Sequence, residues 1–237
     1  MEKRICVFDA YGTLFDINSA ARYYAAESEN EQFVESWTSI SKVWREKQLS
    51  YSWLLTILGK YTDFWKITED SLDYALDFSG IQHDKNLKER LMELYRELEA
   101  FEEVENVLSE LKRNNIACSI LSNGSKFMLN SAVKSSKIET LIDSVISVDE
   151  IRVFKPDPKV YELVLKKYFC KKEEVLFISS NGWDISGASS FGFDTLWINR
   201  SNQPIDRLPF KPSNVGVDLT AVTDSVLKSW PRKIGEK

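Results

Sequence analysis

Hydrophobic and polar positions divide the chain into two regions with different periods. Between residues 19 and 100 the apolar positions recur at helical spacing, as in the series Phe33, Trp37, Ile40 and Trp44. Runs of β-branched residues that are typical of strands are missing from this region. The pattern predicts a small bundle of four or five helices.

Outside that region, short apolar runs alternate with amphipathic segments. The expected strands are "ICVF" (5–8), "IACSILSN" (116–123), "DSVISV" (143–148), "EVLFIS" (174–179) and "DTLWIN" (194–199). The expected helices are "VENVLSELKRN" (104–114), "FMLNSAVKSS" (127–136), "PKVYELVLKKYF" (158–169) and "DISGASSF" (184–191). This alternation indicates a parallel sheet with helices on both faces. We therefore expect a Rossmann-like α/β core, residues 1–15 and 98–237, with a helical-bundle cap domain, residues 16–97, inserted after the first strand.

Composition and charge restrict the partners of the protein. The 237-residue chain has a formal net charge of −5 and an isoelectric point near 5.2, which argues against nucleic acid or an acidic membrane surface as a partner. No apolar stretch approaches the ~18 residues of a membrane-spanning helix, and charged residues stand where an apolar leader would begin. The three widely spaced cysteines fit neither a zinc site nor a disulfide framework. We expect a soluble, cytoplasmic protein.

Polar side chains follow the expected strands at the end where ligands of open parallel sheets bind. They are Asp9, the Ser-Asn-Gly triplet 122–124, the Ser-Ser-Asn triplet 179–181 and Lys155. A carboxylate fixed at a strand end beside a lysine is suited to act as a nucleophile, because the lysine favours its ionised form. Taken alone, "DAYGTL" leaves open that Asp9 only caps the following turn.

In order and in placement, these residues resemble the four motifs of the haloacid dehalogenase superfamily. The matching positions are Asp9 with Gly12-Thr13, Ser122-Asn123-Gly124, Lys155 in "FKPDP" and Asp184 in "SSNGWDISGA". Most members are magnesium-dependent phosphatases, with a second aspartate two residues after the nucleophile and a further metal-binding aspartate after the last strand of the motif set. Here those positions are Tyr11 and Ser180. Since Mg²⁺ prefers hard carboxylate oxygens, we expect no metal site and no cofactor.

Three further strings, "WREKQLSYSWL", "FKPDPKVYEL" and "SSNGWD", resemble the type II branch, the L-2-haloacid dehalogenases. That resemblance implies a metal-independent hydrolase acting on carbon–halide bonds. An (S)-2-haloalkanoate and water would give the (R)-2-hydroxyalkanoate and halide through an ester on Asp9. The implied partners are the small 2-haloalkanoate substrate, the halide product and a second copy of the chain, because family members are often homodimers.

The resemblance also assigns roles to individual residues. The implied catalytic set is Asp9, Thr13, Arg45, Lys155, Ser179, Asn181 and Asp184. The implied substrate-binding set is Tyr11, Arg45, Leu49, Ser122, Asn123, Tyr161 and Trp183. Arg45 would bind the departing halide, Asp184 would polarise the hydrolytic water, and Tyr161 would support Lys155.

Structural roles remain open for some of these residues. Arg45 lies on an amphipathic helix, where an arginine is often a solvated flank. Leu49 and Trp183 could belong to the core, and Ser122 with Asn123 could only satisfy amides at a strand end.

Two other functions also remain open. One is a metal-dependent, phosphatase-like hydrolase of the same superfamily. The other is a non-catalytic module whose helical insertion binds a protein partner. The single histidine, His83, lies in a polar turn and is expected at the surface, so we expect no histidine-dependent mechanism.

Overall fold

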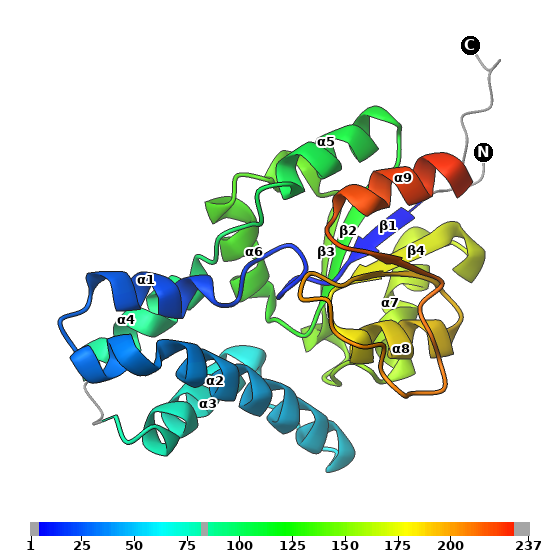
Figure 1. Ribbon diagram of the computed structural model, residues 1–237. Coiled ribbons are helices and arrows are strands. Elements are labelled where there is room, and N and C mark those ends of the chain that lie inside the picture. The colour runs from blue at the N-terminus through cyan, green and yellow to red at the C-terminus, as the bar shows by residue number, and fades with distance from the viewer. Residues whose placement is uncertain (1–4, 82–84, 230–237) are drawn as a thin grey trace.

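The computed structural model describes residues 5–81 and 85–229 of the 237-residue chain, so His83 lies outside the described residues. Figure 1 shows two parts: a group of helices at the left and a sheet flanked by helices at the right. The chain passes from the sheet into the helical group and back again, as the sequence pattern predicted.

The sheet consists, within the described residues, of six parallel strands. In chain order they are β1 (Ile5–Phe8), β2 (Ala117–Ser122), β3 (Ser144–Ser147), β4 (Val175–Ser179), β5 (Asp194–Ile198) and β6 (Asn214–Gly216). Their order across the sheet is β3-β2-β1-β4-β5-β6, the arrangement of doubly wound α/β folds. All five predicted strands are present. β6 was not predicted, because Asn214 and Val215 of this edge strand are exposed and give no apolar run.

Helices of the core cover both faces of the sheet. They are α5 (Val104–Arg113), α6 (Lys126–Ser135), α7 (Pro158–Tyr168), α8 (Gly182–Phe191) and α9 (Thr220–Ser229). α5 packs with α9 on one face, and α7 packs with α8 on the other (Figure 1). α9 was not predicted, and the other four lie within two residues of their expected bounds.

Four helices of the described chain form the inserted group. They are α1 (Ser19–Glu27), α2 (Glu31–Ile57), α3 (Phe64–Phe78) and α4 (Lys85–Arg96). α2 begins where the Asn30 side chain accepts a hydrogen bond from the backbone N–H of Phe33, a regular helix cap. Phe33, Ile40 and Trp44 are buried on one face of α2, which confirms the helical period seen in the sequence.

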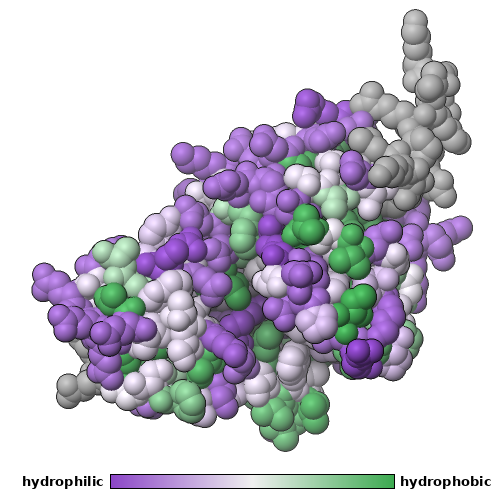
Figure 2. Space-filling view, viewed as in Figure 1, coloured by the Kyte–Doolittle hydropathy of each residue, from purple (hydrophilic) through white to green (hydrophobic). Residues whose placement is uncertain are grey.

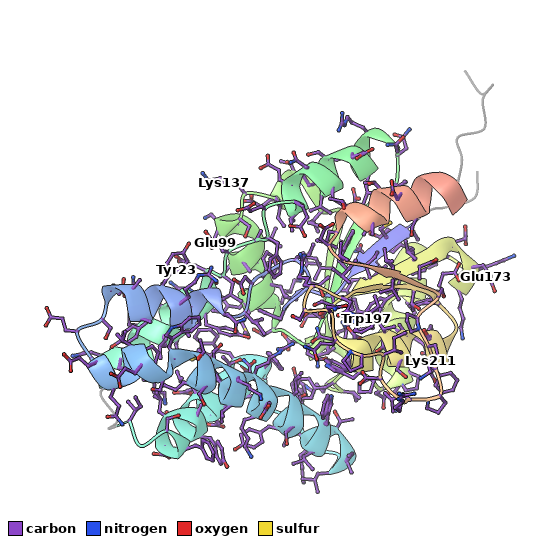
Figure 3. All side chains as sticks on the ribbon, viewed as in Figure 1. Tyr23, Glu99, Lys137, Glu173, Trp197 and Lys211 are labelled. Atoms are coloured by element: carbon purple, nitrogen blue, oxygen red, sulfur yellow. The ribbon has the colours of Figure 1, made fainter. Side chains whose placement is uncertain are left out.

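The two connections between the sheet and the inserted helices lie side by side. The backbone N–H of Asp16 donates to the carbonyl of Glu99 at 2.8 Å, and that of Phe101 donates to the carbonyl of Leu14 at 3.0 Å. On the same side, the Tyr23 hydroxyl donates to the Glu99 carboxylate at 2.6 Å, and Figure 3 shows the two side chains together. These contacts hold the first turn of the insertion next to the carboxyl end of β1.

The outer surface is mainly hydrophilic on the face drawn in Figure 2, with separate apolar patches. One patch covers the end of α2, where Leu54, Ile57 and Leu58 are exposed. In the described part of the chain, no helix is both long enough and apolar enough to cross a membrane.

Candidate active site

Strand β1 carries Asp9 to the middle of the carboxyl edge of the sheet. The strand order reverses between β1 and β4, which is the place where open α/β sheets bind ligands. The backbone N–H of Asp9 donates to the carbonyl of Ile178 in β4 at 2.9 Å, so Asp9 is still fixed to the sheet. Gly12 then adopts a φ of +89°, which side-chain-bearing residues rarely do, and lets the chain turn sharply beside the carboxylate.

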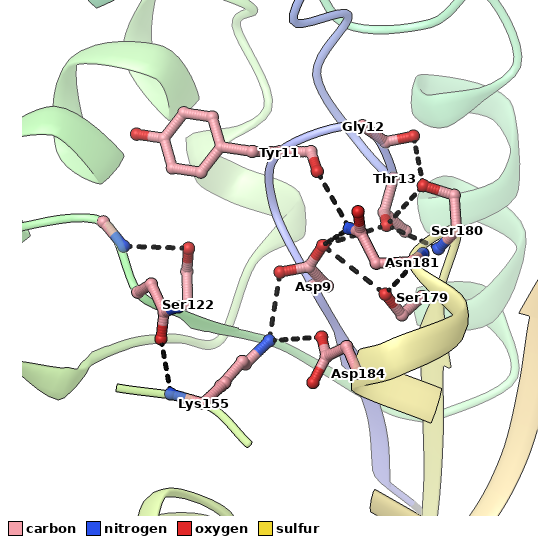
Figure 4. Close-up of polar contacts among 12 residues, drawn as sticks. Asp9, Tyr11, Gly12, Thr13, Ser122, Lys155, Ser179, Ser180, Asn181 and Asp184 are labelled. Carbon is pink, nitrogen blue, oxygen red and sulfur yellow. Dashed lines mark hydrogen bonds and ion pairs between the residues drawn. The ribbon is translucent and has the colours of Figure 1, made fainter. Parts of the chain in front are cut away.

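The Asp9 carboxylate is hydrogen-bonded at both oxygens (Figure 4). Its Oδ1 accepts from the Lys155 Nζ at 3.0 Å. Its Oδ2 accepts from Asn181 Nδ2 at 2.8 Å, from Thr13 Oγ1 at 3.2 Å and from Ser179 Oγ at 3.5 Å. These hydrogen bonds fix the orientation of the carboxylate. Asp9 is only 5% exposed, so water has little access to it.

Lys155 is a buried ammonium group between two carboxylates. Its Nζ also donates to Asp184 Oδ2 at 2.7 Å, and the side chain is 1% exposed. Burial alone would lower the pKa of Lys155, but the nearby carboxylates of Asp184 and Asp9 more than reverse this effect and raise it. Lys155 therefore stays charged. Because each of these three buried charges would be costly without the others, they form one unit.

Asp184 is fully buried behind Lys155, and its Oδ1 accepts a hydrogen bond from the Tyr161 hydroxyl at 2.7 Å. Burial raises the pKa of Asp184 to about 6, although the charge of Lys155 and the hydrogen bond from Tyr161 act in the opposite direction. The carboxylate is thus ionised above that pH and holds a proton more readily than an ordinary aspartate. That property suits a general base.

Tyr161 occupies a different place from the one expected for a substrate-binding residue. It is fully buried, it is not part of the pocket wall described below, and its hydroxyl donates to Asp184 Oδ1 at 2.7 Å. We therefore expect Tyr161 to position Asp184.

Ser180 holds the turn that follows Asp9. Its backbone N–H donates to Thr13 Oγ1 at 2.8 Å, and its hydroxyl donates to the carbonyl of Gly12 at 2.5 Å. The Trp197 indole N–H donates in turn to the Ser180 carbonyl at 3.1 Å. The sequence indicated that Ser180 replaces an acid, but nothing in it indicated this positioning contact.

A small pocket lies beside Asp9, with a cavity volume of only about 10 Å³. Its walls are Asp9, Tyr11, Arg45, Leu49, Phe64, Ser122, Asn123 and Trp183. The structure thus brings together all predicted substrate-binding residues except Tyr161. Arg45 and Leu49 come from α2 and Phe64 from α3, so the inserted helices close a pocket whose base is the sheet. Phe64 was missed, because its position in the sequence is that of an ordinary helical core residue.

The pocket contains two donors suited to an anion. In the described chain the Arg45 guanidinium contacts neutral oxygens: the Tyr11 carbonyl and the Gln48 side-chain oxygen, each at 3.4 Å, and the Tyr95 hydroxyl. The Trp183 indole N–H is buried, and no described residue accepts its hydrogen bond. Arg45 and Trp183 therefore both have N–H groups that could donate to an anion bound in the pocket.

Ser122 and Asn123 at the end of β2 form another part of the wall. Ser122 Oγ accepts from the backbone N–H of Gly124 at 3.1 Å, and Asn123 Oδ1 accepts from the backbone N–H of Lys155 at 2.8 Å. Asn123 therefore fixes the loop that carries Lys155, while the Ser122 hydroxyl still has a proton to donate.

The donor set of the pocket does not fit a magnesium ion. Among residues 5–81 and 85–229, no group of three or more His, Cys, Asp or Glu side chains is arranged to hold a metal ion. The two site acids, Asp9 and Asp184, both face the Lys155 ammonium instead.

Comparison with known proteins agrees with this geometry. A family model described as haloacid dehalogenase-like hydrolase matches residues 3–192. The chain belongs to the haloacid dehalogenase-like hydrolases. It is 43% identical over 201 residues to (S)-2-haloacid dehalogenase 1 of Pseudomonas sp. (strain CBS-3), covering 85% of this chain and 86% of the relative. It is 39% identical over 228 residues to (S)-2-haloacid dehalogenase 4A of Burkholderia cepacia, covering 96% and 94%.

Solved structures of this family of hydrolases show the same fold. The L-2-haloacid dehalogenase from Xanthobacter autotrophicus with chloropropionic acid covalently bound matches with a TM-score of 0.83 at 33% identity, covering 97% of this chain and all of that one. The predicted fold class is therefore confirmed. The roles of the individual site residues remain predictions.

Proposed function

We propose that this haloacid dehalogenase-like hydrolase is an (S)-2-haloacid dehalogenase that converts short-chain (S)-2-haloalkanoates and water into (R)-2-hydroxyalkanoates and halide. The observation that carries the proposal is a fixed aspartate at the base of a small pocket whose wall holds Arg45. The similarity to two (S)-2-haloacid dehalogenases at 43% and 39% identity supports the same chemistry.

In the first step, an oxygen of Asp9 attacks C2 of the substrate from the side opposite the halogen. The new C–O bond forms as the carbon–halogen bond breaks, the halide leaves with the bonding electrons, and C2 inverts. Charge develops on the halide, where the Arg45 guanidinium and the Trp183 indole N–H can receive it. The products of this step are an ester on Asp9 and a halide ion.

The rest of the pocket selects the substrate. The Ser122 hydroxyl and the backbone around Asn123 would bind the substrate carboxylate, which their place in the pocket wall supports. Tyr11, Leu49 and Phe64 enclose the remaining space, which limits the alkyl group to a short chain.

In the second step, water attacks the ester carbonyl carbon of Asp9. Asp184 takes a proton from the water, and Lys155 stabilises the negative charge on the carbonyl oxygen. Thr13, Ser179 and Asn181 hold the Asp9 side chain in place. The bond between the Asp9 carbonyl carbon and the substrate oxygen then breaks, and the departing oxygen takes the proton held by Asp184. The hydroxy acid leaves with an original Asp9 oxygen, and the second proton of the water is lost to solvent as Asp9 regains its carboxylate. Because C2 is not attacked again, the (R) configuration is retained.

The decisive measurement is halide release from each enantiomer of 2-chloropropionate, with and without EDTA. We expect release from the (S) enantiomer only and no effect of EDTA. Hydrolysis of p-nitrophenyl phosphate that EDTA abolishes would favour the phosphatase alternative. A lack of turnover with both substrates would favour the partner-binding alternative.

Asp9→Asn tests the covalent step, because it removes the nucleophile but keeps the shape of the side chain. We expect halide release to be lost in a folded protein, and a single turnover of the wild type in oxygen-18 water to label the peptide that contains Asp9. Label that enters the hydroxy acid directly would show that water attacks C2, and the ester mechanism would be wrong.

Three further parts of the proposal concern organisation. We divide the chain into a core, residues 1–15 and 98–237, and a cap, residues 16–97; the paired connections at Asp16 and Glu99 support this division. We also propose a cytoplasmic homodimer, supported by the acidic composition and by the exposed apolar side chains at the end of α2. Light scattering after size-exclusion chromatography tests the dimer.

A further inference from the structure

Gln48 is a buried polar residue that the mechanism above does not use. It lies on α2 three residues after Arg45, so both side chains are on the same face of the helix. Gln48 is 1% exposed, and its side chain joins three helices. Its Oε1 accepts from the Arg45 Nη1 at 3.4 Å and from the Tyr95 hydroxyl of α4 at 3.2 Å, while its Nε2 donates to Thr68 Oγ1 of α3 at 2.9 Å.

The hydrogen bonds of Thr68 fix which way the Gln48 amide faces. The Thr68 hydroxyl donates its only proton to the carbonyl of Phe64 at 2.7 Å, so it can only accept from Gln48. The Gln48 NH₂ group must therefore face Thr68, and the Gln48 oxygen must face Arg45. The Trp44 indole also donates to the Thr68 carbonyl at 2.8 Å, which ties α2 to α3 at this level.

The residue at position 48 is an amide, which leaves the charge of the Arg45 guanidinium unchanged. An amide oxygen can orient a guanidinium group but does not neutralise its charge, whereas a carboxylate at the same place would form an ion pair. In the described chain, the oxygens that Arg45 contacts are all neutral: the Gln48 amide oxygen, the Tyr11 carbonyl and the Tyr95 hydroxyl. Tyr95 adds rigidity, because its ring also stacks on Tyr11 of the pocket wall, with the ring centroids 5.9 Å apart.

We propose that Gln48 is a positioning residue: held by Thr68 and Tyr95, it directs the Arg45 guanidinium at the departing halide and leaves its positive charge available. This inference rests on the proposed dehalogenase function. It predicts that the neutral amide at position 48 determines how strongly the enzyme stabilises the leaving group.

The test compares Gln48→Glu and Gln48→Met with the wild type. Single-turnover rates of halide release are measured with (S)-2-bromopropionate and (S)-2-chloropropionate, and inhibition by bromide is measured in parallel. Chloride is the poorer leaving group, so weaker halide stabilisation should slow the chloro substrate more. We expect the bromo-to-chloro rate ratio to rise about tenfold in both variants. Bromide inhibition should weaken most in Gln48→Glu, whose carboxylate competes for Arg45.

Ser71→Ala is the matched control. Ser71 is a fully buried residue of α3 whose hydroxyl donates to its own helix at Ile67, and it has no part in the pocket. The Ser71→Ala substitution should lower the melting temperature without changing the bromo-to-chloro rate ratio. If Gln48→Met does not fold, Thr68→Val removes the acceptor of the Gln48 NH₂ group with little change of shape, and the ratio should rise in that variant as well.

The possible results separate this inference from the proposed function. No halide release by the wild type would overturn the proposed function. The role of Gln48 alone would be overturned if the wild type is active but the rate ratio and the bromide inhibition are unchanged in the Gln48 variants. Where Gln48→Met does not fold, the same result in Thr68→Val would overturn it.

Discussion

Asp9, Lys155 and Asp184 together carry one more negative than positive charge in a place that water hardly reaches. Buried ion pairs of this kind contribute little to stability compared with well-packed apolar residues, because each charge must lose its hydration. Their value here is chemical. Lys155 keeps two carboxylates close together, as the proposed mechanism requires, in which Asp9 attacks carbon and Asp184 takes a proton.

Tyr161→Phe is expected to shift the pH dependence of the reaction. The Tyr161 hydroxyl donates to the ionised form of Asp184 and so lowers the pKa of Asp184, which burial raises to about 6. Without this hydrogen bond the pKa should be higher, by about one unit if the bond contributes the ~1.5 kcal/mol typical of bonds to charged groups. Because the base must be ionised, the acidic limb of the pH–kcat profile for halide release should move to higher pH, while the rate near pH 9 changes little.

Tyr168→Phe serves as the control for this shift. Tyr168 ends the same helix, α7, and its hydroxyl contacts Ser119 of β2. Its loss should leave the acidic limb in place. If both variants shift the limb equally, or if neither does, Asp184 is not the base that the profile reports.

At the scale of elements, the pocket depends on turns that lie close together after β1, β2 and β4. Gly124, after β2, lies against the ring of Tyr11, which follows β1. A Cβ atom at position 124 would lie 2.7 Å from the Tyr11 ring carbon Cε2, too close for an ordinary contact. We expect Gly124→Ala to lower the unfolding free energy by about 1–3 kcal/mol, as overpacking usually does. It should also lower kcat/KM about tenfold or more, because Tyr11 moves in the pocket.

Asn30→Ala separates loss of stability from loss of the site. Removing the Asn30 cap of α2 should cost about 1 kcal/mol in unfolding free energy, far from the pocket, and leave kcat/KM unchanged. Urea unfolding and steady-state kinetics on the two variants provide the comparison. Equal activity losses in both would mean that the contact between Gly124 and Tyr11 is unimportant for the reaction.

The strands that the sequence predicted are those whose residues are buried along most of their length. Cys6, Val7 and Phe8 of β1 are fully buried, so the strand is apolar throughout and easily recognised, whereas the exposed residues of β6 give no such signal. The strand-end residues of the site could be placed together because parallel topology places all carboxyl ends at one edge.

The part of the site that comes from the inserted helices could be predicted less well. The helical period shows which side of α2 faces inward, but not which residues of α3 and α4 meet it there. Phe64, Thr68 and Tyr95 therefore looked like ordinary core residues, and the contact of Gln48 with Arg45 was not foreseen. Arg45 itself was found only through the local string "WREKQL".

In the molecule as a whole, the two parts are joined at the paired connections near Asp16 and Glu99, and Arg200 fastens them to the sheet. Its guanidinium pairs with Glu103 at 2.6 Å, donates to the carbonyl of Thr13 at 3.1 Å and lies 3.7 Å from the ring centroid of Phe101. Arg200 thus contacts both the outgoing and the returning connection.

We expect Arg200→Met to increase hydrogen exchange at the amides of Asp16 and Phe101, which donate across the paired connections. The free energy of local opening should fall by about 1–3 kcal/mol, because the variant removes a partly buried ion pair and two further contacts. Arg22→Met is the control: Arg22 also bridges the two connections, at Asp16 and Glu99, but its side chain is 44% exposed. Such a surface pair should change the opening by less than about 1 kcal/mol. Equal exchange in both variants would contradict the role of Arg200.

The adjacency of Asp16 and Glu99 has a consequence for how such a hydrolase could change over evolutionary time. The chain leaves the core and returns to it at almost the same point. The segment between those residues is therefore an insertion whose two ends are adjacent, so it could be replaced without disturbing the core. Exchanging that module would replace Arg45, Gln48, Leu49 and Phe64 in one event while Asp9, Lys155 and Asp184 kept their places. The same core could in this way come to accept substrates with a different leaving group while keeping its nucleophile.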